Sequence, residues 1–174
     1  MLEKAIKKCI WMGGAIYVNG NLDPSTISPG VANKSAEWNA FWDPFAVKWL
    51  FNNTKFDLIL FPLDVTDQVK LDETFLEILN KQAQEYKYSN IVNSLYSLIK
   101  NQPFFEMWNT LTATYISRPD FFETPKKLKL EVVTEGFLQG TIRPSVNGRK
   151  AKVVLKIKDK TAFYNYVLNQ LRRN

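Results

Sequence analysis

Two short apolar runs limit what this chain can fold into more than any other feature of its sequence. Residues 9–12 and 56–61 are almost entirely apolar, and each run leads into a loop of small or polar residues. A short continuous apolar run is typical of a strand buried on both faces, as the strands of a parallel sheet are. Ligands of open α/β folds bind outside the carboxyl ends of such strands, so the two loops predict a site at that edge.

Helices are predicted around these two strands. Asp43 and Pro44 have the residue types of an N-cap and a first helical residue, and the asparagines at 52–53 end that helix. Apolar residues at helical spacing predict further helices over residues 2–8, 71–84, 90–100 and 104–116 and after Asp159.

The order of these elements predicts one α/β domain over residues 1–174, a length at which a single core is expected. Residues 127–134 and 150–158 alternate basic with apolar residues, which predicts half-exposed antiparallel strands. We therefore expect a partial, open, mostly parallel sheet with flanking helices, and a small antiparallel β-hairpin near the C-terminus.

The segment between the first strand and the Asp43 helix is the least regular part of the sequence. Residues 17–35 are rich in Asn, Gly, Pro and Ser, which predicts a long loop, and long loops inside compact domains are often functional. Glu37 follows this loop among the tryptophans of S-A-E-W-N-A-F-W-D-P, and a carboxylate buried among them needs hydrogen-bond partners.

Composition excludes several kinds of chemistry within this chain. There is no histidine, which removes imidazole catalysis, Ser-His and Cys-His pairs and histidine-bound zinc. Cys9 is the only cysteine, which excludes an internal disulfide and fits a reducing, cytoplasmic compartment. No run approaches the roughly 18 apolar residues of a membrane span. The net charge of +6 is spread along the chain, so we expect a solvated surface and no nucleic-acid or membrane partner.

Six short blocks of the chain resemble, in the same order, the motifs of the calcium-dependent nucleoside hydrolases. The blocks are I-W-M-G-G-A (10–15), G-N (20–21), A-E-W-N-A-F-W-D-P-F-A-V (36–47), P-L-D-V-T (62–66), M-W-N-T-L-T-A (107–113) and T-E-G (134–136). The resemblance spans nearly the whole chain but only the C-terminal portion of the family pattern. It implies hydrolysis of the N-glycosidic bond of ribonucleosides to ribose and free base.

The resemblance also implies a role for three polar residues. In the family, calcium binds the attacking water and the ribose 2′- and 3′-hydroxyls, which suits a hard ion with many oxygen ligands. Asn21, Glu37 and Asn39 match the residues that hydrogen-bond the ribose. Glu37 and Asn39 are two residues apart, so we expect them to share one face of an extended segment. Without the family pattern, all three would be interpreted as ordinary loop or turn residues.

Two positions on the predicted helix after residue 104 match further family residues. Trp108 corresponds to the tryptophan that stacks on the base in the purine-preferring branch, although a core tryptophan is the alternative. Asn109 stands where the family has an aspartate calcium ligand, and an amide oxygen brings no negative charge, which makes calcium binding by this chain doubtful. Asp67 stands where the family usually has histidine, and sequence reasoning assigns it no role.

The aspartate cluster D-x-D-x-x-x-D-D, which holds calcium and activates water in the family, does not occur in the 174 residues. We therefore expect the chain to be inactive alone and active only with a complementary N-terminal chain. The alternative is a degenerate pseudo-enzyme or a ribose- or nucleoside-binding interaction protein. A partial sheet has an unpaired edge, so we expect self-association or association with the complementary chain.

Overall fold

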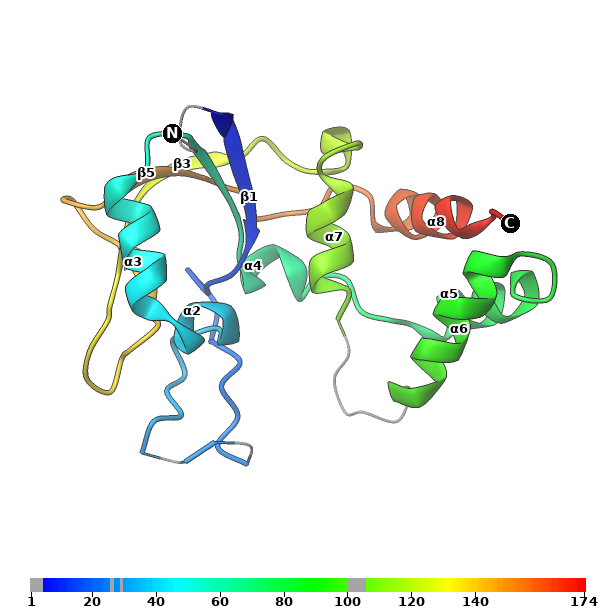
Figure 1. Ribbon diagram of the computed structural model, residues 1–174, viewed down its shortest axis with the longest axis horizontal. Helices are drawn as coiled ribbons and strands as arrows, with labels where there is room; N and C mark the ends of the chain where they lie inside the picture. The colour runs from blue at the N-terminus through cyan, green and yellow to red at the C-terminus, as the bar shows by residue number, and fades with distance from the viewer. Residues whose placement is uncertain (1–4, 26, 29, 100–105) are drawn as a thin grey trace.

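A five-stranded sheet forms the centre of the computed structural model, which describes residues 5–25, 27–28, 30–99 and 106–174 (Figure 1). The strands are β1 (Lys8–Met12), β2 (Asp57–Phe61), β3 (Lys126–Val132), β4 (Ile142–Pro144) and β5 (Arg149–Val153). Their order in the sheet is β1-β2-β5-β3-β4. β1, β2 and β5 run parallel, and β3 runs antiparallel to both β5 and β4. The expected open, mostly parallel sheet is confirmed, with β3 the one reversed strand among those described.

The two strands expected to form a separate hairpin are part of this same sheet. β3 and β5 do pair antiparallel, with Lys126 opposite Val153 and Leu130 opposite Arg149. β5 also pairs parallel with β2, where Leu60 lies opposite Val153. The short strand β4, which the sequence pattern did not reveal, lies beyond β3. The strand closest to the C-terminus therefore occupies the middle of the sheet.

The helices predicted after residue 43 are present, although several differ from the expected bounds by a few residues. Asp43 caps α3 by accepting a hydrogen bond from the Ala46 backbone N–H at 2.8 Å, and Asp159 caps α8 through the Ala162 N–H at 2.8 Å. The helices that follow β1 are α2 (Trp38–Trp42), α3 (Pro44–Asn53), α4 (Leu63–Thr66), α5 (Glu73–Gln82), α6 (Lys87–Ile99), α7 (Trp108–Thr114), the 3-10 helix η1 (Pro119–Phe121) and α8 (Lys160–Leu171).

Three local predictions differ from the structure. Lys8 belongs to β1, so the helix predicted over residues 2–8 does not reach its expected end, and residues 2–4 lie outside the described part of the chain. The segment 62–66, expected as a loop, contains the single turn of α4. Glu37 and Asn39 do not lie in an extended segment, because α2 begins between them.

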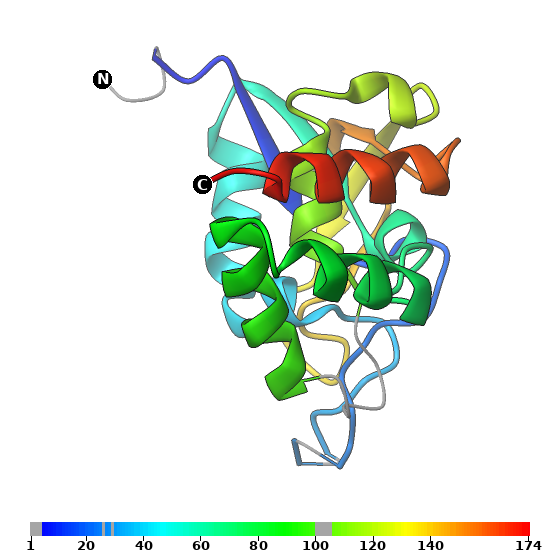
Figure 2. The ribbon, with the colours of Figure 1, turned by 90° about the vertical axis from the view of Figure 1, so that its right-hand side faces the viewer.

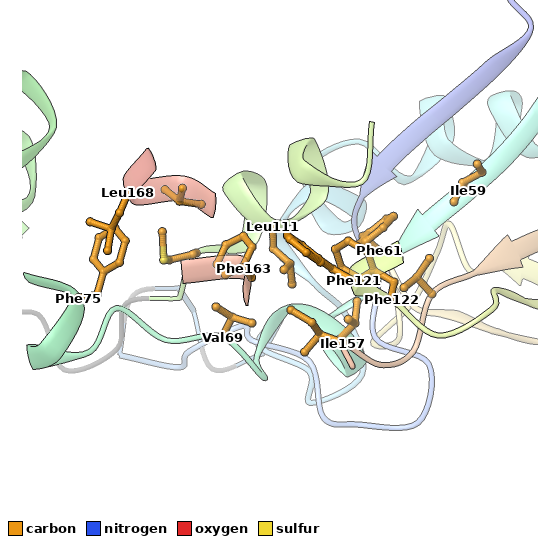
Figure 3. Packing of buried hydrophobic residues seen from close by; sticks show 14 of the residues in the cluster. Ile59, Phe61, Val69, Phe75, Leu111, Phe121, Phe122, Ile157, Phe163 and Leu168 are labelled. Atoms are coloured by element: carbon orange, nitrogen blue, oxygen red, sulfur yellow. The ribbon is translucent and has the colours of Figure 1, made fainter. Parts of the chain in front are cut away.

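β2 is buried on both faces, as its apolar run predicts. Ile59 and Phe61 belong to one hydrophobic cluster, which includes Phe122 and Leu111 and continues to α8 (Figure 3). Leu58 and Leu60 belong to a second cluster, on the opposite face. That second cluster includes Ala40, Phe51, Leu130, Val132, Ile142, Ala151 and Val153. The alternating side chains of one strand therefore link two separate cores.

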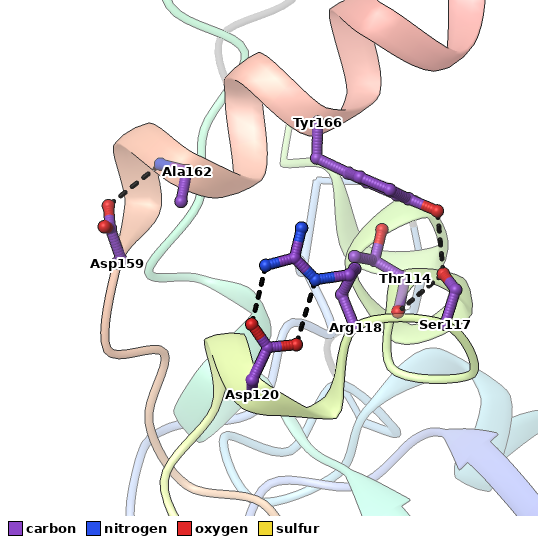
Figure 4. Close-up of polar contacts among 7 residues, drawn as sticks. All are labelled: Thr114, Ser117, Arg118, Asp120, Asp159, Ala162 and Tyr166. Carbon is purple, nitrogen blue, oxygen red and sulfur yellow. Dashed lines mark hydrogen bonds and ion pairs between the residues drawn. The ribbon is translucent and has the colours of Figure 1, made fainter.

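The helices α5, α6 and α8 pack against one another beside the first of these cores (Figure 2). Polar contacts join α8 to the segment that follows α7 (Figure 4). Arg118 donates two hydrogen bonds to the Asp120 carboxylate, at 2.9 and 2.6 Å, and its guanidinium carbon lies 3.9 Å from the centre of the Phe121 ring. Ser117 and Tyr166 share a hydrogen bond of 2.8 Å between their hydroxyls. None of the described helices is long and apolar enough to cross a membrane.

Arg149, the first residue of β5, ties the end of α3 to the sheet. Its guanidinium group donates hydrogen bonds to three backbone carbonyls and one hydroxyl at the end of α3 and just after it. The acceptors are Leu50 O, Phe51 O, Thr54 Oγ1 and Phe56 O. Carbonyls at a helix C-terminus have no partner within the helix, so a planar guanidinium that reaches several of them stabilises the end of α3.

Replacing Arg149 tests this contact. We expect Arg149→Ala to lower the free energy of unfolding by about 2–3 kcal/mol, because several carbonyls lose a charged donor. Arg149→Lys should recover only part of the loss, since an ammonium group cannot reach the same acceptors together. The exposed neighbour Lys150→Ala is the control and should change stability by less than about 0.5 kcal/mol. Urea unfolding measures all three, and equal effects of Arg149→Ala and Lys150→Ala would contradict the assignment.

Candidate functional site

The loops that follow β1 and β2 lie side by side at the carboxyl edge of the sheet. Met12 pairs with Phe61 at the ends of the two strands, and the Gly13 N–H donates to the Phe61 carbonyl at 3.2 Å. Gly14 has a positive φ of 85°, which favours glycine, and its carbonyl accepts from the Leu63 N–H at 2.9 Å. These contacts hold the two loops in fixed register.

Asp64 fixes the next part of the first loop. Its carboxylate accepts hydrogen bonds from the backbone N–H groups of Ile16 at 2.8 Å and Tyr17 at 2.9 Å. Sequence reasoning did not single out this aspartate, because the contact joins residues 48 and 47 positions apart along the chain. The aspartate of P-L-D-V-T therefore supports the edge of the site.

Glu37 is the centre of the candidate site. The residue is only 2% exposed, and it is the N-cap of α2. Its Oε1 accepts from the Asn39 N–H at 3.0 Å, and its Oε2 accepts from the N–H groups of Gly14 at 3.1 Å and Ala40 at 3.4 Å. Burial raises the pKa of Glu37, while these backbone hydrogen bonds oppose the rise. The buried carboxylate therefore has the partners that its position requires, and it connects α2 to the loop after β1.

The two predicted asparagines lie on either side of Glu37. Asn39 is exposed, and its Nδ2 donates to the Met12 carbonyl at 3.2 Å and to the Met12 sulfur at 3.3 Å. Asn21 is half-buried and accepts the Trp38 N–H through Oδ1 at 3.1 Å. The structure therefore brings Asn21, Glu37 and Asn39 together at the end of β1, although by a helix N-terminus rather than by a shared strand face.

Trp108 lies at the same edge of the sheet. It is half-buried at the start of α7 and packs against a small cluster of Met12, Ala15 and Leu63. Its indole Nε1 donates to Asp67 Oδ1 at 2.9 Å. Asp67, which had no assigned role, therefore orients the indole ring. Met12 contacts both the Asn39 side chain and the cluster on which Trp108 packs, so the two predicted functional groups are neighbours.

Asn109 does not form a calcium site with the described residues. Its side chain is exposed on α7, and it lines a cavity of about 270 Å³ with Trp108 and Glu106. Within residues 5–25, 27–28, 30–99 and 106–174, no group of three or more His, Cys, Asp and Glu residues could hold a metal ion. Calcium prefers several charged oxygen ligands, and Asn109 offers one neutral amide oxygen. The residues described here do not by themselves fit the ion.

The Asp67 charge influences two other acids near the carboxyl edge, Glu37 and Glu106. Partial burial raises the pKa of Asp67, and the hydrogen bond from Trp108 opposes the rise. Burial raises the pKa of Glu106, and the Asp67 charge raises it further. The Asp67 charge also contributes to the raised pKa of Glu37. Glu106 is a buried acid that sequence reasoning missed, although a single acid in the apolar segment F-F-E-M-W was a visible signal.

Comparison with known proteins agrees with the family resemblance of the six sequence blocks. A family model described as inosine-uridine preferring nucleoside hydrolase matches residues 1–165. No curated protein sequence matches significantly.

Several solved structures share the fold. An inosine-uridine preferring nucleoside hydrolase from Bacillus anthracis is 27% identical, with a TM-score of 0.84 over 99% of this chain and 53% of its own. A purine-preferring ribonucleoside hydrolase from Gardnerella vaginalis is 19% identical, with a TM-score of 0.72 over 95% of this chain and 52% of its own. A plant nucleoside hydrolase is 17% identical, with a TM-score of 0.75 over 96% and 54%. The chain thus spans about half the length of the structures that it resembles.

The raised pKa of Asp67 predicts how the stability of the chain depends on pH. A carboxyl whose pKa is raised on folding contributes stability below its unfolded value of about 4, and this contribution is lost as pH rises through the folded pKa. We therefore expect Asp67→Asn to match the wild type at low pH and to become progressively more stable than it toward neutral pH. The asparagine Oδ1 can still accept the Trp108 hydrogen bond.

Asp57→Asn is the matched control, because its change in stability with pH should have the opposite sign. The hydrogen bond from Lys152, at 2.6 Å, lowers the pKa of Asp57, so that variant should be less stable than the wild type above about pH 4 and should approach it as pH falls below that value. Urea unfolding across this pH range measures both variants. Parallel curves for Asp67→Asn and the wild type would show that burial does not raise the pKa of Asp67.

Proposed function

This chain belongs to the family of inosine-uridine preferring nucleoside hydrolases, and from this premise we propose that it carries the ribose- and base-binding half of a purine ribonucleoside hydrolase. The proposed reaction is hydrolysis of the N-glycosidic bond to ribose and free base. The observation that supports it most is the position of Glu37, Asn39 and Trp108 together at the end of β1.

The proposed ribose contacts follow from the free hydrogen-bonding capacity at this edge. Each Glu37 oxygen has more than one lone-pair direction, so the carboxylate can accept ribose hydroxyls in addition to its backbone N–H groups. Asn39 binds Met12 through its Nδ2 and is exposed, which makes its Oδ1 suitable as a further acceptor. Asn21 uses its Oδ1 for the Trp38 N–H, which leaves its Nδ2 as a donor to the sugar.

The proposed base contact is the indole of Trp108. A purine has a large flat face, and stacking on an aromatic side chain contributes on the order of 1–3 kcal/mol per base. The hydrogen bond to Asp67 and the packing on Leu63 hold the ring in one orientation, so little entropy is lost when a base stacks on it. The tryptophan at this position is the reason to place the chain near the purine-preferring branch.

Activation of water is assigned to residues outside this sequence. The D-x-D-x-x-x-D-D pattern does not occur in the 174 residues, and the described side chains do not form a calcium site. The chain covers 53% of the Bacillus anthracis structure, so the proposal requires a complementary segment that supplies the acidic cluster. Within this chain, the residues bind and orient the nucleoside, and we expect no turnover by the chain alone.

A second candidate function is nucleoside binding without catalysis. Asn109 favours it, because a neutral amide at a calcium-ligand position weakens the attraction for the ion. The two candidates differ in one measurable property, which is turnover after a complementary acidic segment has been added.

Calorimetry with inosine and ribose tests the binding site. We expect the chain alone to bind inosine more tightly than ribose, because the base adds stacking on Trp108. Trp108→Ala should weaken inosine binding about tenfold or more, whereas Trp108→Phe should keep most of it. Glu37→Gln should weaken both ligands, and the exposed Glu135→Gln is its control. A chain that binds neither ligand would refute the proposed site.

Complementation then separates the enzyme from the binding protein. The chain is mixed with an N-terminal segment of a family member that carries the acidic cluster, together with calcium and inosine. Release of hypoxanthine supports the hydrolase, and binding without release in any pairing supports the second candidate.

The surface beside β1 is the proposed docking place of the complementary segment. β1 lies at the end of the strand order, so its outer edge has no partner among the described strands. A cavity of about 240 Å³ opens beside it and is lined by Trp11, Val47 and other residues of β1 and α3. Trp42, Phe45 and Trp49 are 73%, 61% and 62% exposed on α2 and α3. An apolar surface next to a free strand edge favours pairing with another chain segment.

Without that segment, we expect the chain to self-associate through the same surface. Light scattering should give a mass above the 20.2 kDa of one chain. The combined variant Trp42→Ser, Phe45→Ser, Trp49→Ser should shift the mass toward that of a monomer, because it removes the exposed rings. A monomeric wild type at the same concentration would contradict this expectation.

A further inference from the structure

A second polar residue lines a cavity beside Trp108, on which the base is proposed to stack. The cavity of about 270 Å³ at the start of α7 is lined by six residues, which are Tyr96, Glu106, Met107, Trp108, Asn109 and Thr110. Its volume is just below the roughly 300 Å³ at which ligand pockets for small molecules begin, a size that suits a single base better than a whole nucleoside. Trp108 belongs both to this cavity and to the carboxyl edge of the sheet.

Glu106 is the only acid that lines this cavity among the described residues, and it is poorly satisfied. The residue is 9% exposed, and its Oε2 is buried without a hydrogen-bond partner. Buried polar atoms almost always have partners, so an unpaired carboxyl oxygen at a cavity wall needs an explanation. Because Oε2 has almost no accessible surface, the carboxyl group must turn toward the cavity before a ligand there can supply the missing partner.

The surroundings of Glu106 favour its protonated form. The nearest cation is the Lys70 ammonium group, which lies 4.0 Å from Oε1 and belongs to a side chain that is 71% exposed. Burial, the largest effect, and the Asp67 charge raise the pKa of Glu106, whereas Lys70 lowers it. Tyr96 and Thr110, which also line the cavity, hydrogen-bond each other and bring no charge. A protonated carboxyl group is a hydrogen-bond donor.

We propose that Glu106 is a specificity-determining residue, which donates a hydrogen bond from its carboxyl group to a ring nitrogen of the purine that stacks on Trp108. This inference rests on the proposed function. Purines carry ring nitrogens that accept hydrogen bonds, whereas the uracil ring has none. Stacking on Trp108 supplies affinity for any flat base, and Glu106 adds the distinction between purine and uracil.

The test compares inosine and uridine binding in three variants. Glu106→Leu removes the donor, so inosine should bind about tenfold more weakly while uridine is unchanged. Glu106→Gln keeps a donor of nearly the same shape and should retain inosine binding. Glu77→Gln, an exposed acid on α5, is the control. Unfolding curves establish that each variant is folded. The Glu106 variants should keep nearly the stability of the wild type, because Oε2 has no hydrogen bond to lose and the Lys70 side chain is largely exposed.

The pH dependence of inosine affinity distinguishes this role from a purely structural one, because a purely structural role would not change with the protonation of Glu106. Wild-type affinity for inosine should fall as pH rises through the raised pKa of Glu106, because the carboxyl group loses its proton, and Glu106→Gln should show no such fall. Asp67→Asn should move the fall to lower pH, because the charge that helps keep Glu106 protonated is gone.

The possible failures are distinguishable. Inosine binding that depends on Trp108 but is equal in the wild type and Glu106→Leu would overturn the role of Glu106 and leave the proposed function in place. Equal losses for inosine and uridine in Glu106→Leu would also overturn it, since no base would be distinguished. A wild type that binds no nucleoside would overturn both.

Discussion

The hydrogen bonds of one buried carboxylate hold the candidate site together. Glu37 accepts backbone N–H groups from both the loop after β1 and the first turn of α2. A carboxylate removed from water is costly, and its N–H partners at a helix N-terminus offset that cost. The same carboxylate fixes the distance between α2 and Gly14, so the position of Asn39 relative to Met12 also depends on it. Stability and the proposed binding of a sugar therefore use the same atoms.

The aromatic part of the site is held by a different kind of contact. Trp108 begins α7, whose N-cap Met107 forms no side-chain capping bond, and the indole is held instead by Asp67 and the apolar cluster at the strand ends. Asp67 is thereby close enough to influence Glu37 and Glu106 by its charge. The proposed sugar-binding and base-binding groups lie on separate elements, and the charge of this aspartate raises the pKa of an acid on each side. A substitution that removes the charge at position 67 would therefore lower the pKa of both Glu37 and Glu106.

Local sequence patterns predicted the elements whose signals are local. The Asp43 and Asp159 caps, the apolar run of β2 and the stripe of α5 each depend on neighbours within a few residues, and all four are present. The family resemblance pointed to the positions of Glu37, Asn39 and Trp108, which the structure brings together at one edge.

The features that could not be predicted depend on distant contacts. Glu37 and Asn39 were expected on an extended segment, but α2 starts there because Glu37 caps it with a carboxylate that also reaches Gly14, 23 residues away. The indole contact of Asp67 joins positions 41 residues apart. β5 was expected in a local hairpin, and nothing in its alternating pattern indicated that β2 would be its other neighbour. The unpaired oxygen of Glu106 became visible only once its surroundings were known.

The central place of β5 has a consequence for how the chain acquires its structure. β1 and β2, which carry the candidate site, connect to β3 and β4 only through a strand that begins at Arg149. During synthesis the first two strands therefore leave the ribosome long before the strand that completes their sheet. Pairing across such a separation is slow because a long loop must close first. Until then β2 has an open edge, and that interval is when the nascent chain is most exposed to chaperones and to aggregation.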